Sequence, residues 1–402
     1  MSLQSAVNVD DLALLARRRL PRVVYDYVAG GAEDEVTLKA NRDAFAKVAF
    51  RPRILVGGEI DTTCHLFGQR YESPFMIGPT GLNGLLWPDG DLCLARAAAA
   101  AGIGFTLSTA SNISLEELAR SAPGPKNWFQ LYPWGKPAFS ARLLERAEAA
   151  GYSAVMLTVD SLVPGKRERD LRHGFAHQIR LSPQIVADGL LHPRWLLSVW
   201  MRNGMPRLEN LADFMPPGAT AGQMADFSRE QRNPRFDWED VKRLRDAWKG
   251  PLILKGVLCA DDALKARALG VEGIVISNHG GRQLDGAPAT LAVLPEIVGA
   301  VNGTATVMID GGFRRGTDVL KALALGARAV LLGRATLYGL AAGGQDGVAK
   351  ALAILQDELV RGMRLLGRNA VADLTPNCLA DQEVRPKARA PLPSSQTEPD
   401  RG

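Results

Sequence analysis

His279 and Arg282 lie three residues apart in the stretch SNHGGRQLD, residues 277–285. A neutral imidazole can accept a proton near pH 7, and a guanidinium group can hold a carboxylate through two parallel hydrogen bonds. A histidine next to two glycines is, taken alone, more often an ordinary loop residue. Together the two groups would bind a carboxylic acid and remove a proton from its neighbouring carbon or hydroxyl group.

The elements that must position this pair are short apolar runs that alternate with Ala- and Leu-rich segments. Such runs predict strands buried on both faces, and several of the helical segments end in glycine, a common helix terminator. Eight strands with helical crossovers predict an α/β protein with a (β/α)8 TIM barrel, whereas a doubly wound sheet usually has fewer strands. The predicted strands are residues 74–80, 104–109, 127–132, 154–160, 251–257, 273–278, 306–312 and 329–334.

In such a barrel the active site lies at the carboxyl ends of the strands. Asp160 could there stabilise the imidazolium form of His279, as the aspartate of a catalytic triad does. Arg167 would be a second carboxylate contact, and Tyr27 and Tyr132 could donate hydrogen bonds. Further residues at these strand ends are Pro79, Thr80, Gly81, Ser108, Gln130, Thr158, Lys255, Ser277, Asp310, Gly333 and Arg334.

The last two strands end in DGGFRRG, residues 310–316, and in Gly333-Arg334. Glycine lets backbone N–H groups approach an anion, and a following helix N-terminus favours its charge. Arg314 and Arg334 could therefore clamp a phosphate, although a tight turn with surface arginines is the simpler interpretation of each loop alone. Lys255, within an apolar strand, needs an anionic partner: either an ion pair inside the barrel or an electron-accepting ring.

Two regions lie outside the barrel pattern. Residues 1–70 are predicted to be a helical N-terminal extension, and residues 161–235 form a long insert after the fourth strand. A connection of that length is usually functional. We expect residues 1–384 to form a single domain and the Pro- and Ser-rich residues 385–402 to be a disordered tail.

Composition excludes several classes of protein. A net charge of +5 is too small to indicate nucleic acid binding by itself. The cysteines are widely separated, which predicts free thiols in a reducing compartment and no metal site; they are Cys64, Cys93, Cys259 and Cys378. We find no signal peptide and no apolar run of about 18 residues that could span a bilayer as a helix.

The segments SNHGGRQLDGAPAT, FQLY, TVD, LILKGV, DGGFRRGTDVLKALALGA and LGR resemble the FMN-dependent 2-hydroxy-acid dehydrogenases and oxidases. The resemblance runs from LPRVVYDYVAGGAEDE, residues 20–35, to about residue 367. It implies a (β/α)8 barrel that holds FMN. His279 would be the catalytic base, with Asp160, Tyr132 and Arg282 as further catalytic residues. The implied substrate-binding residues are Tyr27, Tyr132, Arg167, His279 and Arg282.

The resemblance also implies the cofactor contacts. Lys255 would lie at the N1–C2 carbonyl region of the flavin, where its charge stabilises the reduced ring. Contacts to the flavin ring and ribityl chain would come from Pro79, Thr80, Gly81, Ser108, Gln130, Thr158 and Ser277. Contacts to the ribityl chain and phosphate would come from Asp310, Gly311, Gly312, Arg314, Gly333 and Arg334.

Within the family, GPTGLNGLLWPDGDL and NGMPRLENL resemble the branch that oxidises (S)-mandelate. Ala110 is a small residue that would leave room for a substrate ring, and Gly81 resembles the small choice of the dehydrogenases. The implied reaction is oxidation of an (S)-2-hydroxy acid, specifically mandelate, to the 2-keto acid phenylglyoxylate.

Residues 172–207 bear on the electron acceptor. This stretch contains Trp195 and Trp200 among other apolar residues, and it has five arginines against one acid, Asp188. An apolar stretch with a net charge of +4 suits an anionic membrane surface; the alternatives are a lid on the barrel or a subunit contact. We expect a homotetramer that is peripheral to the cytoplasmic side of the inner membrane and passes electrons to a membrane quinone.

Two other functions remain open at this point. The first is a soluble cytoplasmic 2-hydroxy-acid oxidase that uses O₂ and forms H₂O₂. The second is a barrel that binds FMN or a sugar phosphate without redox turnover. His279 beside Arg282 argues against the second, because an isomerase needs no carboxylate clamp next to the flavin.

Overall fold

The computed structural model describes residues 1–380 except residues 125, 176–178 and 180. The predicted tail at 385–402 and the predicted domain boundary at 384 lie outside the described residues. Arg180, one of the arginines of the insert, also lies outside them.

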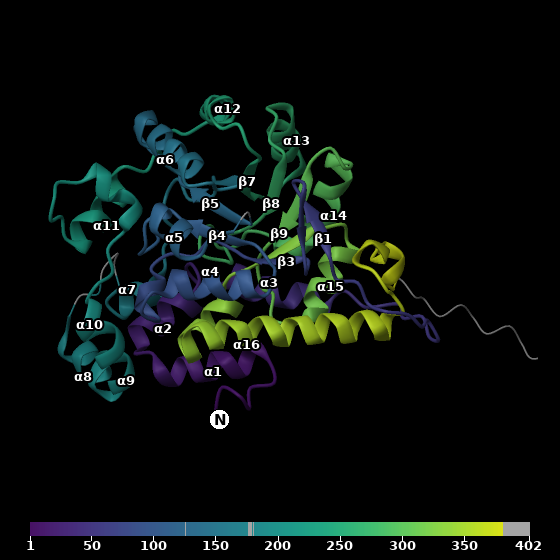
Figure 1. Ribbon diagram of the computed structural model, residues 1–402, viewed down its shortest axis with the longest axis horizontal. Coiled ribbons are helices and arrows are strands. Elements are labelled where there is room, and N and C mark those ends of the chain that lie inside the picture. The colour runs from purple at the N-terminus through teal and green to yellow at the C-terminus, as the bar shows by residue number, and fades with distance from the viewer. Residues whose placement is uncertain (125, 176–178, 180, 381–402) are drawn as a thin grey trace, which may run out of the picture.

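Eight parallel strands close into a barrel in the order β10-β3-β4-β5-β6-β7-β8-β9. Each of the predicted strands is confirmed, and the fold is a TIM barrel with outer helices (Figure 1). The strands are β3 (Phe75–Ile77), β4 (Phe105–Ser108), β5 (Asn127–Leu131), β6 (Ala154–Thr158), β7 (Leu252–Val257), β8 (Gly273–Ile276), β9 (Thr306–Ile309) and β10 (Ala329–Leu332).

The barrel interior is layered because alternate residues of a strand face the same side. One buried cluster contains inward residues of most strands: Met76, Trp128, Met156, Ile253, Val275, Met308 and Leu331. Two residues further along each strand, on the same side, stand Gly78, Gln130, Thr158, Lys255, Ser277, Asp310 and Gly333. The sequence therefore places an apolar layer in the barrel and a mostly polar layer above it, next to the carboxyl ends.

The N-terminal extension is helical only in its first part. It contains α1 (Val9–Arg19), α2 (Arg22–Ala29) and α3 (Val36–Ala46), and Asn8 caps α1 by accepting a hydrogen bond from the amide of Asp11. The prediction of a helical segment to residue 70 was wrong, because β1 (Cys64–Leu66) and β2 (Gln69–Tyr71) form an antiparallel hairpin. Phe67 in its turn packs edge-on against Trp128, so the hairpin closes the amino end of the barrel.

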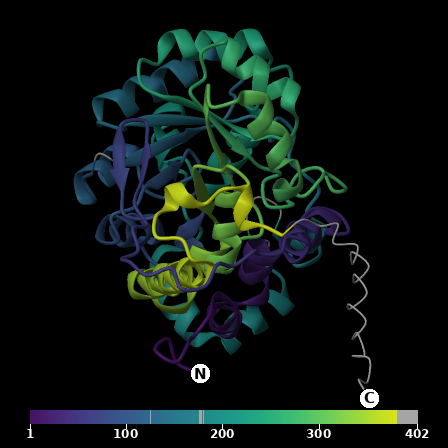
Figure 2. The same cartoon turned by 90° about the vertical axis from the view of Figure 1, so that its right-hand side faces the viewer.

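The outer helices complete the barrel, and the N-terminal helix α1 packs on the long helix α16. Figure 1 shows α16 (Arg334–Leu366) running beside α1. In Figure 2 the yellow C-terminal turns lie next to the chain at 50–61, where Phe50 bridges Leu379. The other outer helices are α4 (Gly90–Ala100), α5 (Leu115–Ser121), α6 (Pro137–Ala149), α12 (Trp238–Ala247), α13 (Ala260–Ala268), α14 (Thr290–Val301) and α15 (Gly316–Ala324).

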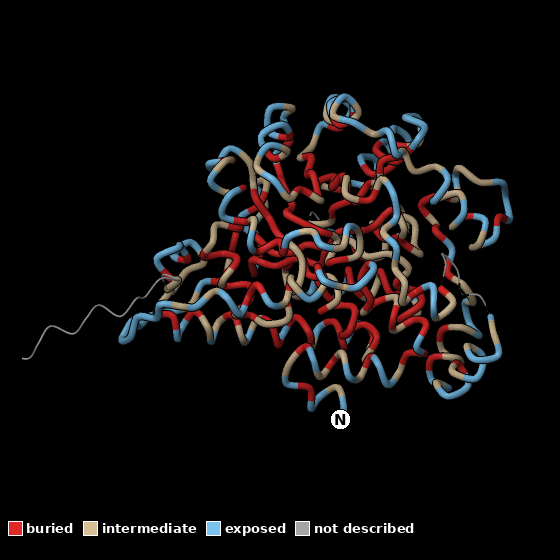
Figure 3. Tube along the Cα trace, turned by 180° about the vertical axis from the view of Figure 1, so that it is seen from behind, coloured by how far each residue is buried: buried red, intermediate tan, exposed pale blue. Residues whose placement is uncertain are grey.

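The predicted insert is present between β6 and β7 and is largely helical. Its helices are α7 (Glu168–Arg172), α8 (Pro183–Leu191), α9 (Pro193–Trp195), the π-helix η2 (Leu196–Trp200), α10 (Met201–Asn203), the 3₁₀ helix η3 (Glu209–Phe214) and α11 (Ala221–Glu230). In Figure 3 the barrel strands are mostly buried, whereas the insert at the right carries long exposed stretches.

Trp195 does not lie on the outer surface of the insert, contrary to its predicted place in a membrane-facing apolar cluster. It is 4% exposed, and its indole N–H donates a hydrogen bond of 2.7 Å to the carbonyl oxygen of Leu85. Trp200 stacks on it at 5.9 Å and is half-buried. The tryptophans therefore anchor the insert to the body of the protein. None of the helices in the described part of the chain is long and apolar enough to cross a bilayer.

Candidate active site

A cavity of about 370 Å³ opens at the carboxyl ends of the barrel strands. That volume is in the range of small-molecule sites. Predicted residues that line it are Tyr27, Pro79, Thr80, Gly81, Ala110, Tyr132, Arg167, Lys255, His279, Arg282, Asp310, Gly311, Gly312, Arg314, Gly333 and Arg334. Residues from all parts of the chain thus meet where the fold predicts an active site.

His279 and Asp160 form the pair that the sequence predicted. Nδ1 of His279 lies 2.9 Å from Oδ1 of Asp160, and the imidazole side chain is 25% exposed. Burial lowers the pKa of His279, although the Asp160 carboxylate acts in the opposite direction. Burial would raise the pKa of Asp160, but His279 and Lys255 outweigh it and lower that pKa. Near neutral pH the pair is therefore a neutral imidazole hydrogen-bonded to a carboxylate.

The loop that carries His279 has an unusual backbone. His279 has φ of 57°, and Gly280 and Gly281 follow with φ of 65° and 75°. A non-glycine residue in this left-handed region persists only where its surroundings hold it. A side chain at position 281 would collide with α3, because its Cβ would stand 2.6 Å from the amide nitrogen of Leu38.

Asn278 supplies the anchor for this loop. Its side-chain amide exchanges two hydrogen bonds, of 2.8 and 2.9 Å, with the side-chain amide of Asn41 in α3. Both residues are buried, and the oxygen of Asn278 also accepts from the amide of Gly281 at 3.1 Å. A helix outside the barrel therefore fixes the backbone on either side of the base.

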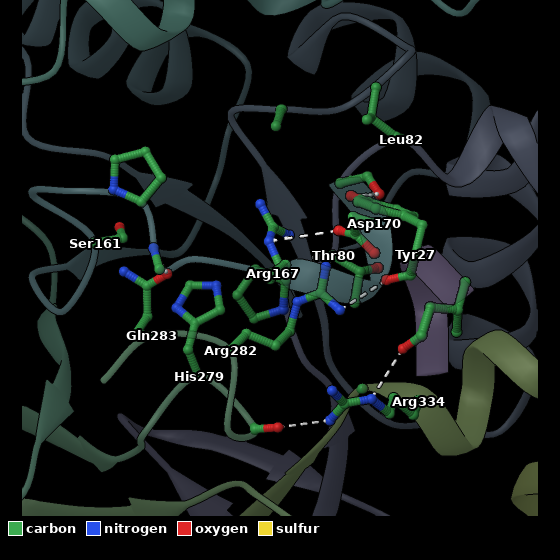
Figure 4. Close-up of a pocket in the computed structure, with 18 of the residues that line it drawn as sticks. Tyr27, Thr80, Leu82, Ser161, Arg167, Asp170, His279, Arg282, Gln283 and Arg334 are labelled. Carbon is green, nitrogen blue, oxygen red and sulfur yellow. Dashed lines mark hydrogen bonds and ion pairs between the residues drawn. The ribbon is translucent and has the colours of Figure 1, made fainter. Parts of the chain in front are cut away.

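Arg282 and Arg167 face the same ring (Figure 4). Their guanidinium carbons lie 5.1 and 6.0 Å from the centre of the Tyr27 ring. Arg282 donates to the backbone oxygens of Tyr27 at 2.7 Å and Gly30 at 3.1 Å, which leaves part of its fork free for a ligand. Burial and the nearby charge of Arg167 lower the pKa of Arg282, so this place favours an added anion.

Asp170 is a buried member of the site that sequence reasoning missed. It is 4% exposed, and its carboxylate lies 3.6 Å from Nε of Arg167. Burial raises the pKa of Asp170 in spite of the arginines around it. Its spacing of three residues from Arg167 in a short helix is a pattern that could have found it.

Buried polar groups at the cavity and in the strands beside it fit FMN. Thr80, Lys255 and Asp310 line the cavity, whereas the predicted residues Ser108, Gln130, Thr158, Asp160 and Ser277 are not among its lining residues. Oγ1 of Thr80, Nε2 of Gln130, Oγ1 of Thr158 and Oδ1 of Asp310 are buried without a hydrogen-bond partner among the described residues. Buried polar atoms are normally paired, so these atoms fit a polar ligand. Ser108 contributes by binding the other amide atom of Gln130 at 3.0 Å, and Ser277 by binding Lys255.

Lys255 has the anionic partner that its place in an apolar strand required. Its Nζ lies 3.1 Å from Oδ2 of Asp310 and 2.8 Å from Oγ of Ser277, so a barrel ion pair exists. It also lines the cavity. Burial would lower the pKa of Lys255, but Asp310 and Asp160 outweigh it and raise that pKa, so the cation is retained at the cavity.

The two loops that were predicted to bind phosphate differ in how many arginine donors they leave free for a ligand. Gly311 and Gly312 have φ of 98° and 85°, and a Cβ on Gly312 would stand 2.5 Å from the backbone oxygen of Asn41. Arg314 uses one nitrogen on its neighbour's carbonyl and lines the cavity. Arg334 instead donates three hydrogen bonds to the carbonyls of Val28, Gly280 and Gly30. Burial, with help from Arg282, lowers the pKa of Arg334 to about 9.

The outer wall of the cavity is apolar and comes partly from the insert. Leu82 and Ala110 stand on the barrel side, and Met205, Pro206 and Leu208 on the insert side. A Cβ added at Gly81 would lie 3.0 Å from Cβ of Ala110, so small residues are needed at both positions, where the two segments approach each other. No periodicity in the sequence indicated that the insert contributes to this wall.

Comparison with known proteins agrees with this site. A family model described as FMN-dependent dehydrogenase matches residues 16–381. The chain is 46% identical to (S)-mandelate dehydrogenase of Pseudomonas putida over 95% of each chain. It is 42% identical to L-lactate oxidase of Nostoc sp. over 93% of this chain and 98% of that one. The crystal structure of the monotopic membrane protein (S)-mandelate dehydrogenase has 46% identity and a TM-score of 0.90, and covers 94% of this chain and 100% of that chain.

The chain therefore belongs to the family of FMN-dependent dehydrogenases. It is an enzyme that uses FMN to oxidise (S)-2-hydroxy acids, and the buried unpaired polar atoms at the cavity and in the strands beside it suit that cofactor. Both the family and the cofactor predicted from the sequence are confirmed.

Proposed function

We propose that this enzyme oxidises (S)-mandelate to phenylglyoxylate. The observation that carries the proposal is a single cavity in which two arginines and a His–Asp pair face an apolar wall with Ala110 in it. The arginines suit the carboxylate, and the wall suits an aryl group. The relative named (S)-mandelate dehydrogenase supports this choice of substrate.

Different residues of the cavity would bind the substrate, orient it and accept its proton. Arg282 and Arg167 hold the substrate carboxylate, because their paired charges favour an anion at the Tyr27 ring. Tyr27 and Tyr132 surround the same space. Nε2 of His279 accepts the proton from the hydroxyl-bearing centre, and Asp160 stabilises the resulting imidazolium through Nδ1. FMN supplies the acceptor for the two electrons that leave the substrate.

The same proposal distributes the cofactor contacts. Thr80, Gln130, Thr158 and Asp310 would satisfy their unpaired atoms on the flavin and ribityl chain, together with Pro79, Gly81, Ser108, Ser277 and Lys255. Gly311, Gly312, Arg314 and Gly333 would surround the phosphate. Arg334 would act there mainly as a nearby positive charge, since carbonyls already accept its hydrogen bonds.

The insert supports attachment to a membrane and a quinone as electron acceptor. Its exposed apolar side chains include Leu190 at 64%, Leu191 at 79%, Leu197 at 63% and Met201 at 69%, and Arg194 and Arg202 are exposed among them. Figure 1 shows α8, α9 and α10 gathered at one edge of the molecule. Leucines beside arginines suit an anionic bilayer surface, and one relative is a monotopic membrane protein. A place on the cytoplasmic side of the inner membrane and a homotetramer remain predictions.

A soluble oxidase that reduces O₂ to H₂O₂ is the second candidate, because L-lactate oxidase is a relative of similar identity. One experiment separates the candidates. The anaerobic flavoprotein is mixed with mandelate, lactate or glycolate, and loss of the yellow absorbance is timed. We expect mandelate to be fastest. Peroxide formed at the rate of substrate oxidation in air would instead support the oxidase.

A further inference from the structure

Arg232 lies where the insert returns to the barrel. The backbone there is joined to the segment after β5, because Trp134 and Arg232 form an antiparallel bridge. The amide of Gly135 donates to the oxygen of Gln231 at 2.7 Å, and the amide of Asn233 donates to the oxygen of Pro133 at 3.2 Å. Arg232 is therefore held against the carboxyl end of β5, and it lines the active-site cavity.

The side chain of Arg232 connects two strand ends of the site. Its guanidinium carbon lies 4.1 Å from the centre of the Tyr132 ring, a close cation–π contact. Nη1 donates a hydrogen bond of 2.7 Å to the carbonyl oxygen of Ser161, the residue after Asp160. No carboxylate of the described residues lies within 4.0 Å of Arg232, so the ring and the carbonyl are what hold its charge.

The orientation of the Tyr132 ring depends on its packing against Arg232. Its hydroxyl group makes no hydrogen bond to any residue that the structure describes, although the ring lines the cavity. A hydroxyl that is not anchored takes its direction from the packing of its ring. The face contact with Arg232 is the shortest of the cation–π contacts at the cavity, since those of Arg282 and Arg167 with Tyr27 are 5.1 and 6.0 Å.

We propose that Arg232 is a positioning residue for the oxidation reaction, which fixes the Tyr132 ring so that its hydroxyl group points at the substrate. The inference rests on the proposed function, because it requires Tyr132 to face the substrate. It also gives the insert a role inside the active site, because residues at the end of the insert hold one wall of the active-site cavity in place.

A double-mutant cycle tests this assignment. Arg232→Met keeps the length of the side chain but removes the charge and the donor, and we expect the anaerobic rate of flavin reduction to fall about tenfold, because small displacements of a catalytic group are costly. Tyr132→Phe keeps the ring and removes the hydroxyl. In the Tyr132→Phe background, Arg232→Met should change the rate by less than about twofold, since residues that act through one group are not additive. Equal effects in both backgrounds would overturn the proposal.

Further measurements separate positioning from structure and from substrate choice. Binding of benzoate, a carboxylate that cannot be oxidised, should be unchanged within about twofold by Arg232→Met, because Arg282 and Arg167 hold the carboxylate; a large loss would overturn the proposal. Arg232→Lys should recover part of the rate, because it keeps a cation over the ring. It replaces Arg232→Met in the cycle if that variant is unstable. Arg235→Met is the matched control, since Arg235 is exposed and its side chain makes none of these contacts.

The cycle uses whichever 2-hydroxy acid reduces the wild-type flavin fastest. If mandelate is not that acid, the proposed substrate is wrong, yet the cycle still reports on Arg232. If mandelate reduces the flavin and the cycle is additive, the proposed function stands and the role of Arg232 is rejected.

Discussion

The two walls of the active-site cavity are built in different ways. The wall at the ends of β6, β7 and β8 consists of buried polar groups that bind one another, such as Asn278 with Asn41 and Lys255 with Asp310. The wall from the middle of the insert, at Met205, Pro206 and Leu208, is apolar, and the insert is half-buried or exposed over much of its length (Figure 3). The difference separates two tasks. The strand ends, together with the charged residues at the two ends of the insert, fix the proton and charge chemistry, whereas residues 205–208 shape the space around the substrate.

Electrostatics explains why the first wall must be rigid. Its charges lie in a low-dielectric interior, where an unpaired charge is costly and a paired one is strongly oriented. Replacing Asn41 with alanine would remove its two hydrogen bonds with the side-chain amide of Asn278, which would keep only its bonds to Pro288 and Gly281, at a cost of about 1–3 kcal/mol. The side chains of Met205, Pro206 and Leu208 carry no charge, so substitutions there should alter specificity more than the chemical step.

The largest effect is expected from His279→Asn. Loss of the base removes the proton-transfer contribution, so flavin reduction should slow by about 10²–10⁴-fold or more. FMN should stay bound, because His279 is not one of the proposed cofactor contacts, and the visible spectrum of the flavin checks this. Reduction at the wild-type rate would remove His279 from its role.

Arg282→Lys should have the next largest effect. Lysine keeps the charge but cannot form the planar two-bond clamp, and it cannot satisfy both the backbone oxygens of helix α2 and a carboxylate. We expect KM to rise and the reduction rate to fall by about 10–100-fold. Arg172→Lys is the control, because Arg172 is exposed and Glu168 is its only ion-pair partner among the residues that the structure describes. Unchanged constants would leave carboxylate binding to Arg167.

The pH dependence of kcat/KM should reflect the protonation of His279 beside Asp160. A base works when it is unprotonated, and burial lowers the pKa of His279 from 6.5. The acidic limb of kcat/KM should therefore fall below pH 6.5. In Asp160→Asn the carboxylate that raises this pKa is lost, so the limb should move to still lower pH while the rate at its plateau falls. A limb that moves to higher pH would contradict the assignment of this limb to His279.

Ala110→Trp tests the apolar wall. A tryptophan there would fill the space beside Gly81, where the approach is already so close that a Cβ added to the glycine would meet Ala110 at 3.0 Å. Mandelate needs that space and lactate does not, so the ratio of their kcat/KM values should fall about tenfold or more, as expected when bulk replaces an aryl pocket. If the ratio stays level, Met205, Pro206 and Leu208 on the insert side define the ring site.

The barrel could be predicted from sequence because each buried strand is a short apolar run that turn residues separate from the neighbouring helical segments. The site could be predicted because its residues stand at strand ends, as Lys255 and Asp310 do. Arg232 could not, since its role arises from a contact between the end of the insert and the distant Tyr132. Asp170 was missed although its spacing of three residues from Arg167 was a local signal. The hairpin β1–β2 was missed because its strands have only three residues each. Trp195 was misplaced because an apolar residue next to arginines suits a membrane and a core equally well.

The smallest effect on chemistry, and a large one on location, is expected from the outer surface of the insert. A deletion of residues 175–210 would be a poor test of the membrane surface. It would remove Phe175, which lies 4.6 Å from the Tyr27 ring, and Asn210, which binds the backbone at Ser108. Changing only exposed side chains avoids this. The combined variant Leu190→Ser, Leu191→Ser, Leu197→Ser and Met201→Ser loses apolar surface that is largely exposed to solvent.

Turnover of this variant with a soluble dye should stay within about twofold of wild type, because the cavity is untouched, whereas co-sedimentation with anionic vesicles should fall by about tenfold or more. Ile54→Ser with Leu55→Ser is the matched control: these side chains are 83% and 98% exposed and lie outside the insert. High salt should weaken vesicle binding of the wild type only in part, because it screens the arginines but not the leucines. If wild type, variant and control all stay in the supernatant, the membrane proposal fails and the soluble oxidase gains; if only the control pair abolishes binding, the membrane contacts the loop at residues 54–56 instead.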